Sequence, residues 1–459
     1  MKNEISPRKL PSAKDSRRHS EWLWLLMAGC VVALLIALFL PRRPKDSSSA
    51  TDPAGKTARA GETGVVPGRR AGGLARRFRS SPPPSAEEIV AGKVSQFGRS
   101  RRDLARAIAR RANKEVPAEV EKFFDAVESG RWEDIKTQWD ELAKRSGQYE
   151  HSEHSADLDL FWPAVLDAYG VAEQAHLWPA QKLLDYGNAI LDSLQPGMVY
   201  VGGTDNGRWI PELLNDTSDG ERHVIVTQNA LADARYLDFV SELYGDRLTT
   251  LTHDDSQRAF QEYTADAQKR FDHDQQFPDE PKQVRPGEGI QVVDGKVQVS
   301  GQVSVMEINE KLLGMLMDKN PDLSFGLQES FPFKGTYADA LPAGPLMELR
   351  APDSQNAFTA ERATQSLDYW RNMAQQVLSD PEAAGSEAAL KSYSHDTDAT
   401  GNLLAAHGFS AEAEAAYRLA SQLWPGGPES VGNLADLLAR NGRESEARQL
   451  LEEFDRQYP

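Results

Sequence analysis

Three polar turns in the middle of the chain carry residue types that bind ligands. They follow short apolar runs at residues 198–203, 223–228 and 248–251, which have the composition of buried strands. Glycines at such turns let a ligand approach the backbone, and Asp and Asn oxygens bind hydroxyls or hard cations. The candidate ligand-binding residues are Gly203, Thr204, Asp205, Asn206, Arg208, Gln228, Asn229, His253, Asp254 and Asp255. Ordinary turns and helix caps use the same residue types, so a purely structural role is the alternative interpretation.

No catalytic motif accompanies these turns. The sequence has no phosphate-binding loop, no Rossmann fingerprint and no Gly-x-Ser-x-Gly elbow. The HSEH run at residues 151–154 lacks the two-residue gap of zinc proteases, and His253 and His273 stand beside aspartates without a further partner at metal-ligand spacing. We therefore expect no catalytic residue, no metal and no cofactor. The balance is against an enzyme, although an enzyme that uses the Asp residues stays an alternative.

Alternating strands and helices should position the turns. Each of the three apolar runs is followed by a stretch of helical spacing, which is typical of a parallel sheet. In such a sheet the turns after the strands share one edge, where open α/β proteins bind ligands. A hairpin with its turn at residues 294–296 and further strands at residues 323–330 and 346–350 follow. The sequence thus predicts an α/β domain with a mostly parallel sheet over residues 197–352.

Residues 22–40 predict a membrane helix. The run WLWLLMAGCVVALLIALFL carries no charge, and at about 1.5 Å per residue it just spans a hydrocarbon core of roughly 30 Å. Basic residues follow it where a signal peptide would have its small cleavage-site residues, so an uncleaved anchor is favoured. The short basic N-terminus at residues 1–21 is easier to retain than the large body. We therefore expect a single-pass protein of the bacterial inner membrane with its body on the non-cytoplasmic side.

The charge of the chain is divided between two regions. Residues 1–114 hold 24 Lys and Arg against 9 Asp and Glu, whereas the remainder holds 28 against 60 and carries a net charge of −32. Such a body repels nucleic acid, so we expect no nucleic-acid partner but a neutral, cationic or metal-bearing one. Residues 41–96 are basic and rich in Ser, Gly and Pro, which predicts a disordered linker. A basic helix predicted from residue 97 either leans on the acidic body or touches the membrane surface.

Helical hairpins are predicted on both sides of the α/β domain. Residues 97–196 contain one that breaks at Gly130, and the region 353–459 contains an internal repeat. Residues thirty-four apart match in type, namely Leu404 with Leu438, Gly408 with Gly442, Ala413 with Ala447, Tyr417 with Leu451 and Pro425 with Pro459. This pattern resembles the tetratricopeptide repeat, in which small residues let paired helices approach and a glycine opens the turn. These repeats present a peptide-binding face, although a structural cap is equally compatible with this length.

The predicted fold is therefore an α/β central domain flanked by helical hairpins and C-terminal repeats, preceded by one transmembrane helix. The segments VYVGGTDNGRWIP, VTQNALADARYLDF, DDSQRAFQEY and GKVQVSGQVSVMEIN together resemble the soluble region of uncharacterised bacterial membrane proteins with C-terminal tetratricopeptide repeats. More distantly, the first segment resembles the region after the membrane portion of bacterial O-mannosyltransferase-like proteins. The resemblance covers roughly residues 160–459. Those transferases have many membrane spans for a lipid-linked donor, whereas this chain has one predicted span, so we expect that it does not itself transfer mannose from a lipid carrier.

Three classes of function follow from these features. The favoured one is a membrane-anchored interaction protein, because a tether, a linker and helical repeats together hold a protein partner near a membrane. A ligand-binding or accessory module for envelope glycan assembly is the second, because of the polar turns and the distant resemblance. The third is an enzyme that uses the Asp residues.

Overall fold

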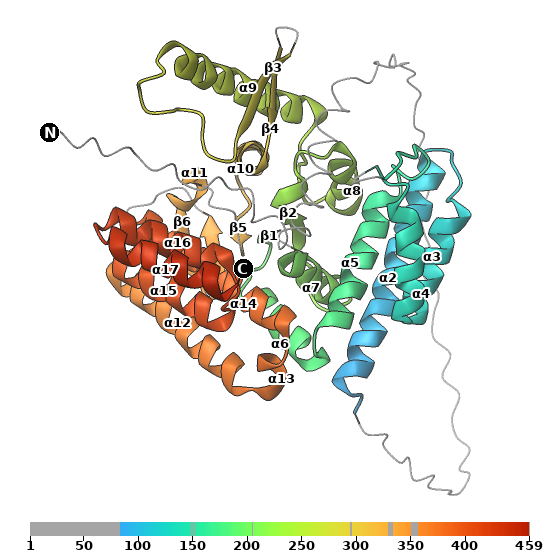
Figure 1. Ribbon diagram of the computed structural model, residues 1–459. Coiled ribbons are helices and arrows are strands. Elements are labelled where there is room, and N and C mark those ends of the chain that lie inside the picture. Colours follow the sequence, from blue (N-terminus) through green and yellow to red (C-terminus); the bar gives the residue numbers. More distant parts are fainter. Residues whose placement is uncertain are drawn as a thin grey trace, which may run out of the picture.

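The computed structural model describes residues 83–458 except 148, 150–151, 204, 294–295, 329–333 and 350–356. The predicted membrane helix at residues 22–40 lies outside this range, as does most of the predicted linker. None of the helices within this range is long and apolar enough to cross a membrane. The described chain is mostly helical with a small mixed sheet, and the sheet lies between two groups of helices (Figure 1).

The first group of helices includes the predicted hairpin. Its members are α2 (Ala86–Arg111), α3 (Ala118–Ser129), α4 (Trp132–Ala143), α5 (Trp162–Leu177) and α6 (Ala180–Leu191). The break at Gly130 is confirmed: this residue caps α3 with φ 71°, in the left-handed region that glycine enters without a steric penalty. The hairpin of α3 and α4 packs beside α2 and α5.

Helix α2 begins earlier than the basic run alone predicts. Ser85 and Glu88 form a capping box, in which each side chain accepts a hydrogen bond from the backbone N–H of the other residue. Val90 and Val94 are buried on the next turns. The predicted linker boundary at residue 96 is therefore wrong, because residues 86–96 belong to this helix.

The basic face of α2 leans on acidic helices. Arg102 and Arg106 form ion pairs with Glu121 of α3 at 3.3 and 2.8 Å, and Arg111 pairs with Glu242. These contacts favour the interpretation of α2 as a helix that packs on the acidic body. These ion pairs thus offset part of the charge difference between the two regions of the sequence.

The central sheet is mixed, not mostly parallel. Its strands are β1 (Val199–Gly202), β2 (Val224–Thr227), β5 (Phe325–Leu327), β6 (Ala340–Ala343) and β7 (Leu346–Leu349), in the order β2-β1-β5-β7-β6. The first three are parallel, whereas β7 is antiparallel to both β5 and β6. Only residues 344 and 345 join β6 to β7, with Gly344 at φ 65°, and so short a connection forces an antiparallel return.

Helices and a projecting unit complete the middle of the chain. Helices α7 (Asp205–Asp216) and α8 (Ala234–Tyr244) follow β1 and β2. A unit made of α9 (His253–Gln276), the predicted hairpin β3 (Gly289–Val293) and β4 (Lys296–Ser300), and α10 (Gln302–Lys319) projects above the sheet in Figure 1. A short helix, α11 (Lys334–Tyr337), precedes β6.

The predicted strand at residues 248–251 is not a strand. Leu248 and Leu251 are buried, as expected of an apolar run, but none of the strands in the described part of the chain pairs with them. The side-chain amide of Asn320 instead bonds both backbone groups of Thr249, at 2.8 and 2.9 Å. The Asn320 side chain thus makes the backbone hydrogen bonds that a neighbouring strand would otherwise make. The periodicity of the run could not reveal this partner.

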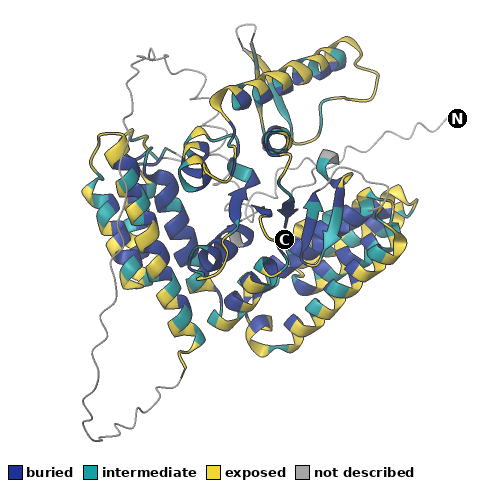
Figure 2. Cartoon of the chain, turned by 180° about the vertical axis from the view of Figure 1, so that it is seen from behind, coloured by how far each residue is buried: buried dark blue, intermediate teal, exposed yellow. Residues whose placement is uncertain are grey.

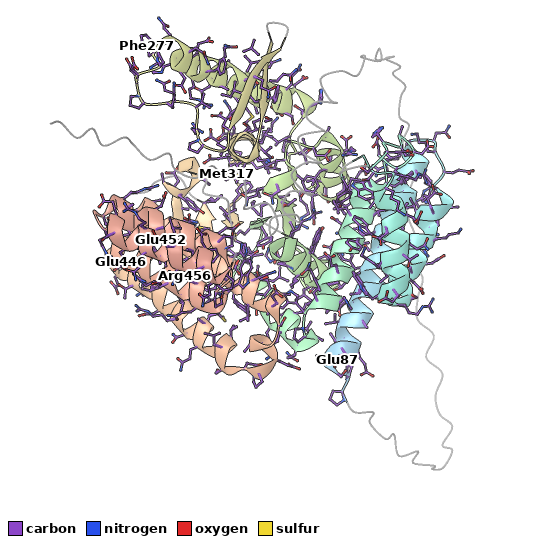
Figure 3. All side chains as sticks on the ribbon, in the orientation of Figure 1. Glu87, Phe277, Met317, Glu446, Glu452 and Arg456 are labelled. Atoms are coloured by element: carbon purple, nitrogen blue, oxygen red, sulfur yellow. The ribbon has the colours of Figure 1, made fainter. Side chains whose placement is uncertain are left out.

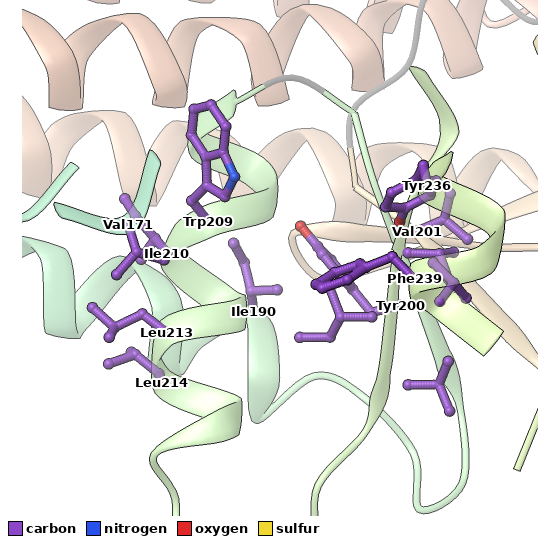
Figure 4. Close-up of a cluster of buried hydrophobic side chains, with 14 of the residues drawn as sticks. Val171, Ile190, Tyr200, Val201, Trp209, Ile210, Leu213, Leu214, Tyr236 and Phe239 are labelled. Carbon is purple, nitrogen blue, oxygen red and sulfur yellow. The ribbon is translucent and has the colours of Figure 1, made fainter. Parts of the chain in front are cut away.

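One apolar core joins most of the helices to the sheet, and a second apolar cluster lies among the C-terminal helices. Figure 4 shows the side chains of α5, α6, α7 and α8 that gather beside β1. Gly170 lets α5 and α7 approach closely, because a Cβ atom there would lie 2.1 Å from the ring of Trp209. Burial is concentrated on the faces that helices turn toward one another, as Figure 2 shows.

The last group of helices, called the repeat lobe below, consists of α12 (Ala360–Ser379), α13 (Pro381–Ala384), α14 (Glu387–Ala406), α15 (Ser410–Leu423), α16 (Pro428–Arg440) and α17 (Glu444–Gln457). The 34-residue period predicted from the sequence is present in its geometry. Gly408 and Gly442 both turn the chain with positive φ, 82° and 76°. Ala413 and Ala447 are both buried where the second helix of each pair meets the first. Pro459, the partner of Pro425 in the pattern, lies outside the described residues.

Candidate functional site

The polar turns after β1 and β2 meet, as predicted. Gly202 pairs with Thr227 in the parallel register, so the residues that follow are neighbours. The Asn229 amide donates to the carbonyl oxygen of Gly203 at 2.7 Å, and the Thr227 hydroxyl donates to the same oxygen at 3.4 Å. Gln228 is fully buried beside them. Thr204 and the side chains of Asp205 and Asn206 lie outside what the structure describes.

These hydrogen bonds fix the turn after β2 in place. Asn229 uses its side chain on Gly203, and its own carbonyl oxygen accepts from the Asn309 amide at 3.4 Å. Asn309 also accepts from the backbone N–H of Ala232 at 3.2 Å. The amides therefore fix the β2 turn against β1 and α10, which is the structural role considered as the alternative for these residues.

Arg208 points away from this edge into a buried ionic network. The network, defined here as Arg101, Asp167, Arg208, Glu212 and Asp216, joins α2, α5 and α7. Asp167 accepts from Arg208 and, at 3.1 Å, from Arg101. Arg101 also pairs with Glu212 and with Asp216, each at 2.8 Å, and Arg208 lies 3.4 Å from Glu212.

Aromatic rings enclose the network. The Arg101 guanidinium lies 4.1 Å from the ring centre of Phe97, and that of Arg208 lies 5.3 Å from Tyr236. The Tyr236 hydroxyl accepts from the backbone N–H of Thr227 at 2.7 Å, which links the network to the end of β2. Side chains within it are nearly inaccessible, with Asp167 0% and Arg101 1% exposed.

Burial and charge set the protonation of the network. Burial raises the pKa of Glu212 to about 8, and the neighbouring Asp167 charge acts in the same direction against the two arginines. Burial lowers the pKa of Arg101, but the carboxylates of Asp216, Glu212 and Asp167 outweigh it, so the net shift is upward. The raised pKa of Glu212 favours its protonated form, which reduces the excess of negative charge around the two arginines. The ion pairs of the network join α2, α5 and α7, and none of its side chains is more than 11% exposed.

Arg101 is the network residue that sequence reasoning missed. From the sequence it is one of several arginines in the basic helix predicted from residue 97. The signal was nevertheless present, because Phe97, Arg101, Leu104 and Ile108 are spaced by four, three and four residues along one helical face. An arginine within an apolar stripe indicates a buried partner on a neighbouring element.

A second buried polar cluster, defined as Tyr186, Tyr200, Gln328 and Asp396, lies at the end of β5. Asp396 of α14 accepts from the Tyr186 hydroxyl at 3.0 Å and from the Gln328 amide at 2.9 Å. Tyr200 of β1 donates to Gln328. The cluster connects the sheet and α6 to the first repeated hairpin, and nothing in the charge pattern of the sequence marks it.

The third turn does not join the others. His253 and Asp254 are exposed at the start of α9, and Asp255 forms a capping box with Thr252. Burial alone would raise the pKa of Asp255, but hydrogen bonds from Thr252 and the Lys319 ammonium at 2.9 Å lower it to about 2. The expected gathering of all three turns is therefore wrong, and its cause is the missing strand at residues 248–251.

Neither the described side chains nor the comparisons with known proteins assign a chemistry to the site. Among the side chains that the structure describes, no group of three or more His, Cys, Asp or Glu could hold a metal ion. The chain matches no protein-family model, no curated protein and no solved structure.

Proposed function

We propose that this chain is a single-pass membrane-anchored interaction protein whose acidic body holds a cationic protein partner through tetratricopeptide-like hairpins. The observation that carries the proposal is the 34-residue period of the repeat lobe. Equivalent backbone bonds close the two turns, from Phe409 to Leu404 and from Arg443 to Leu438, each at 2.9 Å. Gly401 packs on the ring of Tyr417, where a Cβ atom would lie 2.5 Å from it. A small residue against an aromatic ring across the helix pair is typical of this repeat.

One exposed surface of the repeats is a polar stripe on α16. Glu429, Asn433, Asp436 and Arg440 are spaced by four, three and four residues, so they lie along one helix face. The side chain of Asp436 is 73% exposed and that of Glu429 47%. Asn433 donates to Asp398 of α14 at 2.7 Å, which places this stripe beside the first repeat. We call these four residues the α16 stripe.

The first repeat contributes less surface. Most of α14 is buried, because its Asp396 is bound to Tyr186 and Gln328 and its other faces pack on α12, α13 and α15. Helix α14 therefore joins the repeats to the sheet, and the partner contacts α16. A body with a net charge of −32 and exposed carboxylates on the stripe favours a cationic partner through long-range attraction.

Charge reversal on the stripe tests the proposal. Glu429→Lys with Asp436→Lys should remove a partner that is cross-linked to the full chain in membranes. The matched control is Glu452→Lys with Asp455→Lys on α17, where both side chains are exposed and Figure 3 labels Glu452. A partner that survives the α16 change, or that is lost equally from the α17 control, contradicts the assignment of this face.

The anchor is tested separately. If residues 22–40 span the bilayer, the full chain should resist alkaline extraction from membranes. A chain that lacks these residues should be released. A reporter that is active only outside the cytoplasm, fused after Pro459, should be active. An extractable full chain rejects the anchor, and an inactive reporter rejects the orientation.

A further inference from the structure

A cavity lies between the β6–β7 hairpin and α12, apart from both buried polar clusters. Its volume is about 330 Å³, at the lower end of the range for small-molecule sites. One wall is a single face of α12 with Arg362, Gln365, Ser366 and Tyr369, spaced by three, one and three residues. The other wall is the hairpin, with Leu341, Pro342, Gly344 and Glu348.

Two polar groups in the α12 wall have unmet bonding capacity. Ser366 is 8% exposed, and its buried hydroxyl oxygen has no hydrogen-bond partner in the described part of the chain. Buried hydroxyls normally have one, because an unmet hydrogen bond costs free energy. Arg362 is half-buried, and none of the described carboxylates lies within ion-pair distance of it. On the same helix the exposed Arg371 pairs with Asp368 at 3.0 Å.

The position of Arg362 strengthens its preference for an anion. It lies in the first turn of α12, where the helix dipole already provides positive potential. The dipole of its own helix therefore does not stabilise the positive charge of the guanidinium. The acidic body supplies many carboxylates, yet none reaches this guanidinium. A bound anion would satisfy both Arg362 and the Ser366 hydroxyl, which are one helical turn apart.

We propose that this cavity binds the carboxylate group of a small monoanionic ligand with an aliphatic part. Arg362 and Ser366 hold the carboxylate, and Gln365, whose amide now donates only a long bond of 3.4 Å to Glu361, provides a further donor. Leu341 and Pro342 contact the aliphatic part.

Two sources can supply this chemistry, a free organic acid or the C-terminal carboxylate of a peptide. Calorimetric titration of the full chain in detergent separates these two sources. The probes are 4-methylpentanoate, its neutral amide, and a leucine-terminated peptide with either a free or an amidated C-terminus. Binding of the free acid or of the free-ended peptide, with no binding of the matched amides, is expected. Whichever of the two binds more tightly identifies the source.

Variants connect binding to the cavity. Arg362→Gln should weaken the carboxylate probe on the order of tenfold to a hundredfold, and Ser366→Ala about fivefold. Arg371→Gln, the same change at an exposed site of α12 outside the cavity, should leave affinity unchanged. Because Arg362 has no described ion-pair partner, its replacement should not alter the melting temperature. The proposal is overturned if no probe saturates the chain up to its solubility limit, or if the acid and its amide bind equally. It is also overturned if Arg362→Gln leaves the affinity for the carboxylate probe unchanged.

Discussion

Replacing Arg101 by Met measures how far the buried ionic network stabilises the fold. The substitution preserves much of the side-chain volume but removes the cation shared by Asp167, Glu212 and Asp216. Removing one member of a buried ion pair typically costs about 3–5 kcal/mol, because an uncompensated charge is left in a low-dielectric environment. Arg208 still pairs with Asp167 and Glu212, so Asp216 alone loses its cation among these five residues. We therefore expect about 3 kcal/mol, near the lower end.

The pH dependence gives this prediction a second readout. Glu212 has a raised pKa of about 8 against an ordinary value of 4.5, so the folded chain binds more protons than the unfolded chain in this window. The free energy of unfolding from this group therefore falls as the pH rises from about 4.5 to about 8. Arg101 is one of the two cations that oppose this shift, so its loss should raise the Glu212 pKa further. The cost of Arg101→Met should then be smaller at pH 5 than at pH 9, values chosen on either side of about 8.

Urea unfolding of a fragment that begins at residue 83, followed by tryptophan fluorescence, measures both effects. The fragment must include α2, because α2 packs on α3, α5 and α6. Arg106→Met is the matched control, with the same substitution on the same helix at a side chain that is 44% exposed. It should cost less than about 1 kcal/mol. Equal costs for the two variants, or a cost for Arg101→Met that does not grow with pH, would refute the reasoning.

Two further substitutions test the repeat and the α9 cap. Ala447→Trp should lower the free energy of unfolding by about 1–3 kcal/mol, because the buried alanine lies at the crossing of α16 and α17. The control Arg448→Trp, at the next and exposed position, should have little effect on thermal unfolding. Equal melting temperatures of the two variants would reject the repeat packing. Asp255→Ala should cost about 1–3 kcal/mol and Asp254→Ala no more than about 0.5. Because the pKa of Asp255 is lowered, its contribution to the free energy of unfolding is present above about pH 3.8 and is lost as the pH falls toward about 2. The stabilities of the two variants should therefore converge in acid. A difference in stability that stays constant with pH would exclude this cap.

Local signals in the sequence predicted local structure well. Gly130, Gly408 and Gly442 end helices with positive φ, where a glycine after an apolar-periodic stretch indicates a turn. The runs at residues 198–203 and 223–228 form β1 and β2, because a short run of buried, mainly apolar residues suits a strand covered on both faces. Each of these features depends on residues adjacent in the chain, so one sequence is enough to show them.

Features that depend on distant partners were harder to predict. The run at residues 248–251 has strand composition, but its backbone is satisfied by Asn320, seventy-one residues away. Strand β6 contains Pro342 and has a short apolar pattern, which is compatible with an edge strand but does not identify one. Arg101 was recognisable as an exception within an apolar stripe, yet only the fold shows which carboxylates it meets.

The two buried polar clusters explain why the chain forms one body from helices, sheet and repeats. Apolar contacts alone specify that helices pack, whereas a buried charge tolerates few alternative arrangements, because every displaced partner leaves an unpaired group. The ionic network fixes α2, α5 and α7 beside β1, and Asp396 fixes α14 to the end of β5. Most of the α14 surface that a first repeat would present to a partner is therefore buried. Under the proposed function, a partner bound to the α16 stripe would sit on helices that are fixed to the sheet through Asp396, and this connection would hold the partner at a defined position.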